Sequence, residues 1–433
     1  MSVSVIGAGL AGCEAAWQLA NHGIKVRLHE MKPQKFSPAH KYNGFAELVC
    51  SNSLKAMRIE SAAGLLKEEM RRLGSLIIEC ADATAVSAGG ALAVDREQFS
   101  NRVTAKISDH PNIEVVTGEV TGIPDGDVII ATGPLTSDAF SATIKSLLGG
   151  EYLSFYDAAA PIVTFDSIDQ DKVFFAARYD RGDADYINCP MNKEEYESFH
   201  SALVSAESVE LKSFENMTVY EGCMPVEVLA KRGTDAIRYG PLKPVGLRDP
   251  NTGHRPWAVV QLRKENAEGS LYNLVGFQTN LRFPEQKRVF SMIPGLEHAD
   301  FMRYGVMHRN TFIDSPRLLD STYRLKKDSR IYFAGQITGV EGYIESAASG
   351  ILAGINLARR LQGGQPLILP RETMLGALTA YISDESVASF QPMGCNMGIL
   401  PPLGEKIRDK SARYLALAQR GLQKLDEQIA TIK

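Results

Sequence analysis

The first thirty residues show a regular succession of apolar and glycine-rich segments. Ser2–Ile6 is a short run of residues that favour strands, and it ends at a glycine-rich turn, residues 7–12. In residues 13–23, CEAAWQLANHG, apolar residues recur at helical spacing before a terminal glycine, which predicts a helix. Residues 25–29, KVRLH, predict a second strand, and Glu30 follows it. This succession is typical of a βαβ unit that binds a dinucleotide.

The glycines of this turn each have a physical reason. Gly7 permits the tight turn, Gly9 lets the backbone approach a pyrophosphate, and Gly12 lets the helix pack closely on the strand. The helix N-terminus presents N–H groups and a positive dipole end to the phosphates. Glu30 is placed to accept a hydrogen bond from a ribose hydroxyl. We therefore expect an adenine dinucleotide to be bound by Gly7, Ala8, Gly9, Leu10, Ala11, Gly12 and Glu30.

Two later segments favour FAD over NAD. Residues 127–135, DVIIATGPL, predict a buried strand that runs into a glycine. Residues 330–342, RIYFAGQITGVEG, predict another, and the helical pattern that follows would aim its N-terminus at a flavin or its phosphate. A dehydrogenase does not need this late return to the sheet, whereas a two-part flavoprotein domain does. The expected cofactor contacts therefore include Thr132, Gly133, Gly335, Gln336, Tyr343 and Glu345, with a helix-terminal charge as the alternative for Glu345.

The middle of the chain has a different pattern. Strand-like runs occur at residues 161–165, 172–177, 257–263 and 271–277, with a polar helical stretch at 193–212. We expect an α/β fold, in which a Rossmann-type FAD-binding domain is split in sequence by an inserted α+β domain containing an antiparallel sheet. The predicted parts are 1–150 for the first half of the FAD-binding domain, 151–305 for the inserted substrate or tRNA domain, and 306–433 for the second half with C-terminal helices. The tail from Glu405 onward is rich in basic residues and predicts a solvent-facing helix.

Composition and charge exclude several classes of protein. The chain has 433 residues, of which 44% are hydrophobic and 23% charged, so it is neither disordered nor fibrous. A formal net charge of −4 excludes a uniformly basic nucleic-acid coat protein, although it is compatible with a local basic face. No apolar run is long enough for a membrane helix, and the N-terminus has no signal-peptide pattern. We therefore expect a cytoplasmic protein with no membrane partner.

The six cysteines are scattered without a C-x-x-C pair, so we expect neither a metal centre nor a disulfide framework. Cys50 lies in ELVCSNSL, where polar neighbours could cap a helix, and a thiol at a helix N-terminus gains thiolate character. Cys223 lies in YEGCMPVEV beside a glycine. Both could instead be buried packing residues. That is the interpretation we favour for Cys13, Cys80, Cys189 and Cys395.

Basic and aromatic residues interleave in residues 302–310, MRYGVMHRN, with Arg282, Lys287 and Arg288 just upstream. Arg303, Tyr304, His308 and Arg309 in this stretch would suit a phosphate or base-stacking surface. The rim of a flavin site and an ordinary solvated surface remain equally open interpretations.

Long sequence blocks follow one another along nearly the whole chain. They are VIGAGLAGCEAAWQLA, FAELVCSNSL, AGGALAVDREQFS, ATGPLTS, ADYINCPM, CMPVE, GPLKPVGL, VVQLR, LVGFQTNL, MIPGLE, RYGVMHRNTF, AGQITGVEGYIESAASGILAG and FQPM. In these blocks the chain resembles the TrmFO family, the folate- and FAD-dependent tRNA (uracil-5-)-methyltransferases. The tRNA-modifying GidA (MnmG) flavoproteins share the block around GQITGVEGY but are longer, with an added C-terminal helical domain. We therefore expect TrmFO chemistry rather than the wobble-uridine modification of GidA.

The resemblance implies a reaction that composition does not reveal. Members of this family methylate a uridine in the T loop of tRNA to ribothymidine, taking the carbon from 5,10-methylenetetrahydrofolate and using NAD(P)H to reduce the FAD. By the resemblance, Cys223 would be the nucleophile that attacks C6 of the uracil. Cys50 would lie near the flavin and assist or protect the methylene carrier, although the two roles are less secure than the placement of both cysteines in the site. The sequence does not identify the nicotinamide preference, the folate pocket, the general base, the tRNA footprint or the oligomeric state.

Two functions of other classes would also use a flavin. An FAD oxidoreductase of a small molecule would oxidise NAD(P)H regardless of folate and RNA. A non-catalytic RNA-binding flavoprotein would bind tRNA with a steep salt dependence and leave the uridine unmodified. Neither explains two cysteines that lie in family-specific blocks.

Overall fold

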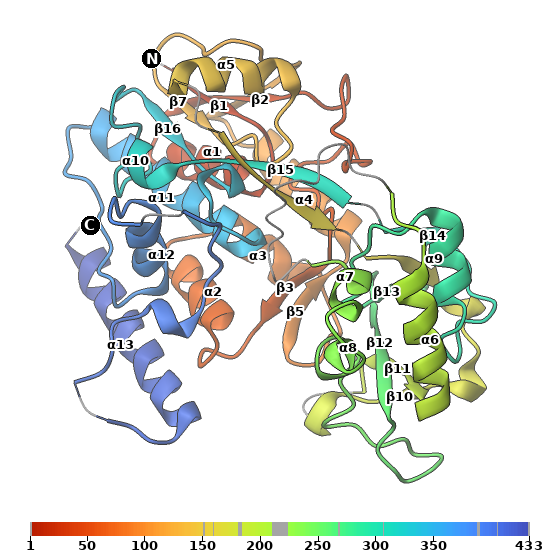
Figure 1. Ribbon diagram of the computed structural model, residues 1–433. Helices are drawn as coiled ribbons and strands as arrows, with labels where there is room; N and C mark the ends of the chain where they lie inside the picture. The colour runs from red at the N-terminus through yellow and green to blue at the C-terminus, as the bar shows by residue number, and fades with distance from the viewer. Residues whose placement is uncertain are drawn as a thin grey trace.

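A five-stranded parallel sheet forms the centre of the larger part of the molecule in a computed structural model of the chain (Figure 1). The structure describes residues 2–149, 152–158, 160–180, 184–209, 224–266, 269–305, 307–387, 390–404 and 406–431. In spatial order the strands are β16 (Ile331–Phe333), β7 (Val128–Ile130), β1 (Ser2–Ile6), β2 (Lys25–Glu30) and β6 (Ile113–Thr117). All four neighbouring pairs are parallel. The chain thus leaves the sheet after β7 and returns to it with β16, which confirms the predicted split Rossmann-type fold.

Two helices pack side by side on this sheet, α1 (Leu10–Asn21) and α11 (Tyr343–Leu361) (Figure 1). They approach so closely that a Cβ atom on Gly350 would lie 2.2 Å from the carbonyl oxygen of Ala11. A Cβ on Gly354 would lie 2.8 Å from the carbonyl oxygen of Ala15. Since these contacts advance in the same direction along both helices, α1 and α11 run parallel. Both N-termini therefore end at the carboxyl edge of the sheet, after β1 and β16.

Further helices and a small sheet surround this core. They are α2 (Ala62–Arg72), α3 (Leu76–Ala83), α4 (Arg96–Ser108), α5 (Asp138–Leu148), α10 (Ser315–Leu318), α12 (Met374–Ile382) and α13 (Lys410–Ala430), with β3 (Ser53–Ala56), β4 (Ala85–Val86) and β5 (Ala91–Val94). The predicted solvent-facing tail helix is α13, and here the prediction was incomplete. Leu417, Leu422 and Leu425 bury one face of α13, which contacts α2.

The second part of the molecule is built on a six-stranded antiparallel sheet with its own hydrophobic core. Its strands in spatial order are β10 (Phe174–Phe175), β11 (Tyr186–Met191), β12 (Ala258–Lys264), β13 (Leu271–Leu274), β9 (Ile162–Thr164) and β14 (Phe301–Arg303). The helices here are α6 (Lys193–Ser205), α7 (Val226–Ala230), α8 (Ala236–Tyr239) and α9 (Phe283–Phe290). The predicted α+β insertion with an antiparallel sheet is confirmed. Helix α6 ends at Ser205, earlier than predicted, because the backbone at Ala206 is extended.

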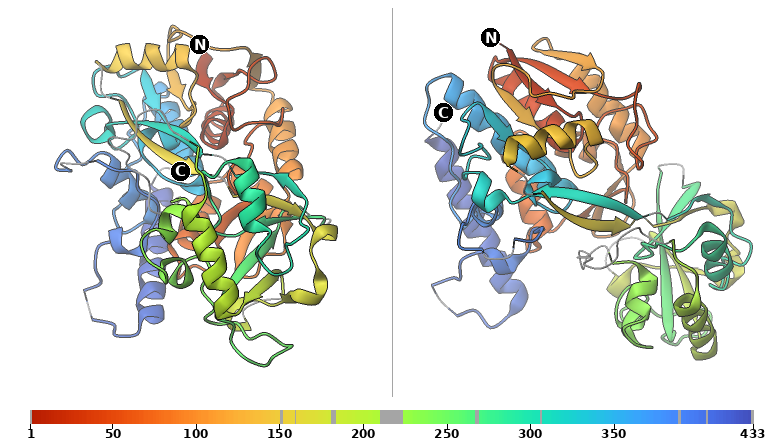
Figure 2. Two further views of the ribbon diagram at one scale, coloured as in Figure 1. Left: turned by 45° about the vertical axis from the view of Figure 1, so that its right-hand side comes forward. Right: turned by 45° about the horizontal axis from the view of Figure 1, so that its top comes forward.

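A two-stranded antiparallel ribbon joins the two parts, as Figure 2 shows. It consists of β8 (Tyr152–Ala158) and β15 (Met307–Ile313). The predicted boundaries, between residues 150 and 151 and between 305 and 306, fall next to these two strands. The division of the chain at those residues stays a prediction.

Candidate active site

A pocket of about 1170 Å³, including space that is open to solvent, lies at the carboxyl edge of the parallel sheet. Most of the predicted cofactor residues line it: Gly7, Ala8, Gly9, Leu10, Ala11, Glu30, Thr132, Gly133, Gly335, Gln336 and Tyr343. Gly12 and Glu345, which the structure also describes, lie outside this lining.

The glycine turn has the geometry that a phosphate needs. Gly7 has φ +98°, and a Cβ there would lie 2.7 Å from the carbonyl oxygen of Ala131, so only glycine fits. Gly12 packs directly against the turn. A Cβ there would overlap the carbonyl oxygen of Gly7, so this position also requires glycine. At Gly9 a Cβ would meet no described atom within 4 Å, so this position faces open space. Helix α1 begins there with no side-chain cap and no acidic residue in its first turn among the described residues. Its N-terminal N–H groups and dipole are thus available to an anion.

Glu30 fixes the turn relative to the next segment. Its carboxylate accepts hydrogen bonds from the backbone N–H of Ala8 and from that of Lys32, both at 2.9 Å. The residue is buried, and each of its oxygens can accept a further bond. Glu30 can therefore hold the turn and still receive a ribose hydroxyl from the pocket.

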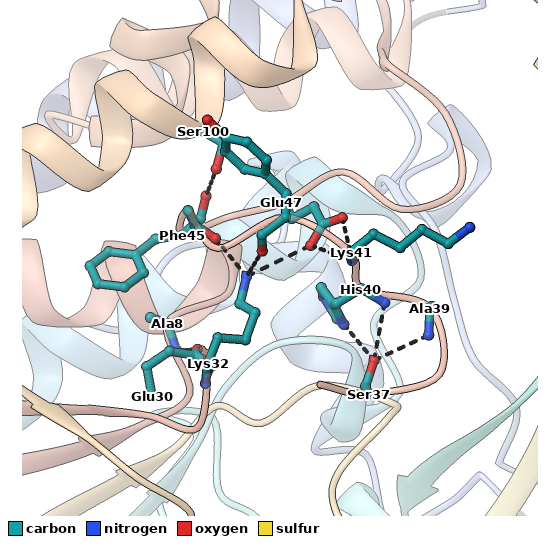
Figure 3. A network of polar contacts seen from close by, with 12 residues as sticks. Ala8, Glu30, Lys32, Ser37, Ala39, His40, Lys41, Phe45, Glu47 and Ser100 are labelled. Carbon is teal, nitrogen blue, oxygen red and sulfur yellow. Dashed lines mark hydrogen bonds and ion pairs between the residues drawn. The ribbon is translucent and has the colours of Figure 1, made fainter. Parts of the chain in front are cut away.

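The loop of residues 31–52, all of them described, contains no helix or strand, and side chains hold it in place (Figure 3). The Lys32 Nζ donates to the carbonyl of Tyr42 at 3.1 Å and lies 3.7 Å from a carboxylate oxygen of Glu47. Ser37 and His40 form a hydrogen bond of 2.5 Å between Oγ and Nδ1. Lys32, His40 and Glu47 line the pocket. Sequence reasoning missed them, and the length of an unstructured loop directly after β2 was the available signal.

Cys50 lies at the end of this loop, beside the pocket. The hydroxyl of Tyr343 accepts hydrogen bonds from the backbone N–H of Cys50 at 2.6 Å and of Ser51 at 3.2 Å. Burial and the neighbouring Cys50 raise the pKa of the Tyr343 phenol above its ordinary value, so the phenol stays neutral. The expectation of a helix N-terminus at Cys50 was wrong, because the residues after it lead into strand β3.

Cys223, the other predicted catalytic residue, lies outside the described residues. Cys13, Cys80 and Cys189 are buried. Burial raises the pKa of the Cys80 thiol to about 11, which keeps it protonated at neutral pH. Cys395 is partly buried, and its backbone N–H donates to Glu345 at 3.0 Å.

Glu345 links three segments of the chain through its carboxylate. Its side chain is fully buried in the first turn of α11, and one oxygen accepts from the Lys55 Nζ at 2.6 Å. The same oxygen accepts the bond from Cys395. Glu345 thus ties β3 and the segment around Cys395 to the helix that carries Tyr343.

The basic and aromatic stretch around residue 303 divides into two environments. Arg303 turns inward and donates to the carbonyl of Val49 in the Cys50 loop. Tyr304 stacks on Phe283, with ring centroids 4.9 Å apart, and on Phe301 at 5.4 Å. The side chains of His308 and Arg309 lie outside the described part of the chain. Arg303 therefore contacts the loop that carries Cys50.

Among the described residues, no helix is long and apolar enough to span a membrane. Within the same ranges, no group of three or more His, Cys, Asp or Glu side chains is arranged to hold a metal ion.

Comparison with known proteins identifies the family to which the chain belongs. The sequence profile of the family described as Glucose inhibited division protein A (GIDA) matches residues 2–365. The methylenetetrahydrofolate–tRNA-(uracil-5-)-methyltransferase TrmFO of Acetivibrio thermocellus is 62% identical over 99% of this chain and 98% of its own. The protein of the same name from Heliobacterium modesticaldum is 60% identical, again over 99% and 98% of the two chains. The chain belongs to the TrmFO family.

The TrmFO-family chain also resembles a solved structure in its fold. The Aquifex aeolicus GidA structure (form II crystal) superposes with a TM-score of 0.70 at 17% sequence identity. The match covers 100% of this chain and 75% of GidA. At such low identity the likeness concerns the fold alone, and it agrees with the split sheet and insertion of this TrmFO-family protein.

Proposed function

We propose that this protein is an FAD-dependent methyltransferase that forms 5-methyluridine in the T loop of tRNA, with 5,10-methylenetetrahydrofolate as carbon donor and NAD(P)H as reductant. The observation that carries this proposal is the 62% identity over 99% of the chain with a protein whose name states the folate, the tRNA and the uracil C5 position. The pocket geometry supports the cofactor part of the proposal independently of the name.

The residues of the pocket fit FAD. The open N-terminus of α1, with Gly9 facing empty space, suits a pyrophosphate, and the carboxylate of Glu30 suits the adenosine ribose. Helix α11 also begins without a side-chain cap among the described residues, at Gly342, so its dipole can face the flavin end. Bound FAD would supply the hydride chemistry that converts a methylene carbon into a methyl group.

The thiols would act on the uracil and on the carbon carrier. A thiolate that adds to C6 of uracil pushes electrons to C5, which then becomes nucleophilic enough to accept the carbon, and the thiolate leaves when the C5 proton is removed. We assign this addition to Cys223. We assign to Cys50, whose backbone N–H donates to the Tyr343 hydroxyl, the contact with the carbon carrier.

A methylation assay on unmodified tRNA tests the proposal. One reaction contains methylenetetrahydrofolate and NADPH, another S-adenosylmethionine, and nucleosides are identified by mass spectrometry. We expect ribothymidine only with folate, and none from a tRNA whose T-loop uridine is replaced by cytidine. If flavin-loaded protein gave no ribothymidine, or modified the wobble uridine instead, the methyltransferase proposal would fail and a GidA-like activity or a small-molecule oxidoreductase would take its place.

The role of Cys223 has a separate test. A tRNA containing 5-fluorouridine at the target position should form a covalent adduct with the unaltered protein, because the fluorine cannot leave as the C5 proton does. Cys223→Ala should lose the adduct, with Cys189→Ala, a change at a buried cysteine, as control. An undiminished adduct in Cys223→Ala would remove Cys223 from the role of nucleophile.

A further inference from the structure

Three arginines from separate elements hold the loop that carries Cys50. Arg96, at the start of α4, donates to the carbonyl of Leu48 at 2.6 Å. Arg303, on β14, donates to the carbonyl of Val49. Arg263, on β12, donates from Nη2 to Ser51 Oγ at 2.6 Å and from Nε to Asn52 Oδ1 at 3.1 Å. The two residues on either side of Cys50 are thus each bound by a guanidinium.

The charge of this cluster is not balanced by carboxylates. Among the described residues, one carboxylate, that of Glu265, forms an ion pair with the cluster, through Arg96. Glu265 and Arg263 are both buried, at 4% and 8% exposure. Buried charges are rarely left without a counter-charge, because their desolvation is costly. Three cations facing one buried carboxylate therefore favour a second negative group close by.

Cys50 is the ionisable side chain that lies between these anchored residues. Burial and the neighbouring Arg96 lower the pKa of the Arg263 guanidinium, whereas Tyr186, Glu265 and Cys50 act in the opposite direction. Burial and Arg96 likewise lower the pKa of Arg303, whereas Tyr343, Cys50 and Glu265 oppose this shift. Such interactions are reciprocal, so the positive charge of a nearby guanidinium favours the charged form of a thiol.

The other titratable groups around the thiol alter this balance little. Tyr343 stays neutral, because burial raises its pKa. The carboxylate of Glu265 would repel a thiolate, but burial raises the pKa of Glu265 and its carboxylate pairs with Arg96. Arg263 and Arg303 are therefore the charged groups whose interactions with Cys50 favour a thiolate.

We propose that Arg96, Arg263 and Arg303 are positioning residues that hold Cys50 as a thiolate beside the cofactor pocket at neutral pH. Arg263 and Arg303 supply the charge, while Arg96 fixes the loop and neutralises Glu265. Arg263 and Arg303 come from the antiparallel-sheet part and Arg96 from the parallel-sheet part, so the thiolate depends on contact between the two. The role of this thiolate in methyl transfer rests on the proposed function, whereas its formation does not.

Alkylation by iodoacetamide over a range of pH tests the proposal. The FAD-loaded full-length protein is used without folate or RNA, and the modification of Cys50 is followed by peptide mass spectrometry. An ordinary thiol reacts with a midpoint near pH 8.5, and we expect a midpoint at least about one unit lower for Cys50. Arg263→Gln and Arg303→Gln should each raise the midpoint by roughly one unit and slow alkylation about tenfold below it. Arg303→Lys, which keeps the charge, should restore most of the shift.

Arg288→Gln is the matched control, since Arg288 is paired with Glu285 on the surface of α9. It should leave the midpoint of Cys50 unchanged. A midpoint at or above 8.5 in the unaltered protein, or Gln variants that keep FAD and the unaltered midpoint, would overturn the proposal. If Arg263→Gln does not fold, the less buried Arg303→Gln decides. A low midpoint in a protein that makes no ribothymidine would instead refute the proposed function and leave the thiolate standing.

Discussion

Replacing Gly9 with valine should separate cofactor binding from folding. Gly9 is the N-cap of α1 and has φ −77°, a value that any residue adopts. A Cβ atom there would meet no described atom within 4 Å, so the valine projects into the pocket without a clash. A poorer N-cap should lower the free energy of unfolding of the FAD-free chain by about 1 kcal/mol or less.

The effect on FAD should be much larger. Valine at this position would displace the pyrophosphate from the N–H groups at the start of α1. A hydrogen bond to a charged group contributes about 1.5–3 kcal/mol, so the loss of two costs about 3–6 kcal/mol. This corresponds to a Kd for FAD that rises roughly 10²- to 10⁴-fold.

The assay is a titration of FAD into FAD-free protein, followed by flavin fluorescence, together with thermal unfolding of the same sample. Gly90→Val is the control, because a Cβ on Gly90 also meets no described atom within 4 Å and Gly90 does not line the pocket. A Gly9→Val protein that stays yellow with full FAD occupancy would refute this view of the turn.

Three further predictions concern the support of the site. Tyr343→Phe removes the acceptor for the Cys50 and Ser51 N–H groups, so it should lower turnover at least about tenfold while FAD stays bound. Unchanged turnover would show that the hydroxyl is not needed. Gly350→Ala places a Cβ 2.2 Å from the Ala11 carbonyl and should destabilise the protein by about 1–3 kcal/mol in urea unfolding, whereas unaltered stability would contradict the tight α1–α11 contact. Burial raises the pKa of the Glu14 carboxyl from 4.5 to about 7, so the folded state binds the carboxyl proton more tightly than the unfolded state. The free energy of unfolding should therefore fall by up to about 3 kcal/mol as the pH rises from about 4.5 to 7. Glu14→Gln should flatten this loss, and urea unfolding at several pH values that showed the same slope in both proteins would argue against it.

Local patterns were sufficient to predict four of the five strands of the parallel sheet, whereas β6 was not predicted. The strand, the glycine turn and the helix of the first βαβ unit each have a signal within a few residues, and β1 occupies the predicted Ser2–Ile6. The late strand β16 was predicted because residues 330–342 repeat the form of a buried strand that ends in glycine. The antiparallel insertion followed from strand-like runs separated by turns.

Interactions between distant segments could not be predicted in this way. Arg96, Arg263 and Arg303 are far apart in sequence, and only the contact between the two parts of the fold brings them to one loop. Glu345 was expected to line the flavin pocket, whereas tertiary packing pairs its carboxylate with Lys55. The same limit applies to Cys50, whose polar neighbours lead into a strand and not a helix.

The central claim is that the new methyl group takes its carbon from folate and one hydrogen from the reduced flavin. The most direct measurement uses methylenetetrahydrofolate labelled with ¹³C and two deuterium atoms at the methylene carbon, with unlabelled NADPH and unmodified tRNA. Mass spectrometry of the nucleosides should show ribothymidine whose methyl group carries ¹³C, both deuterium atoms and one ordinary hydrogen. Ribothymidine without the label, or no ribothymidine from FAD-loaded protein, would contradict the account.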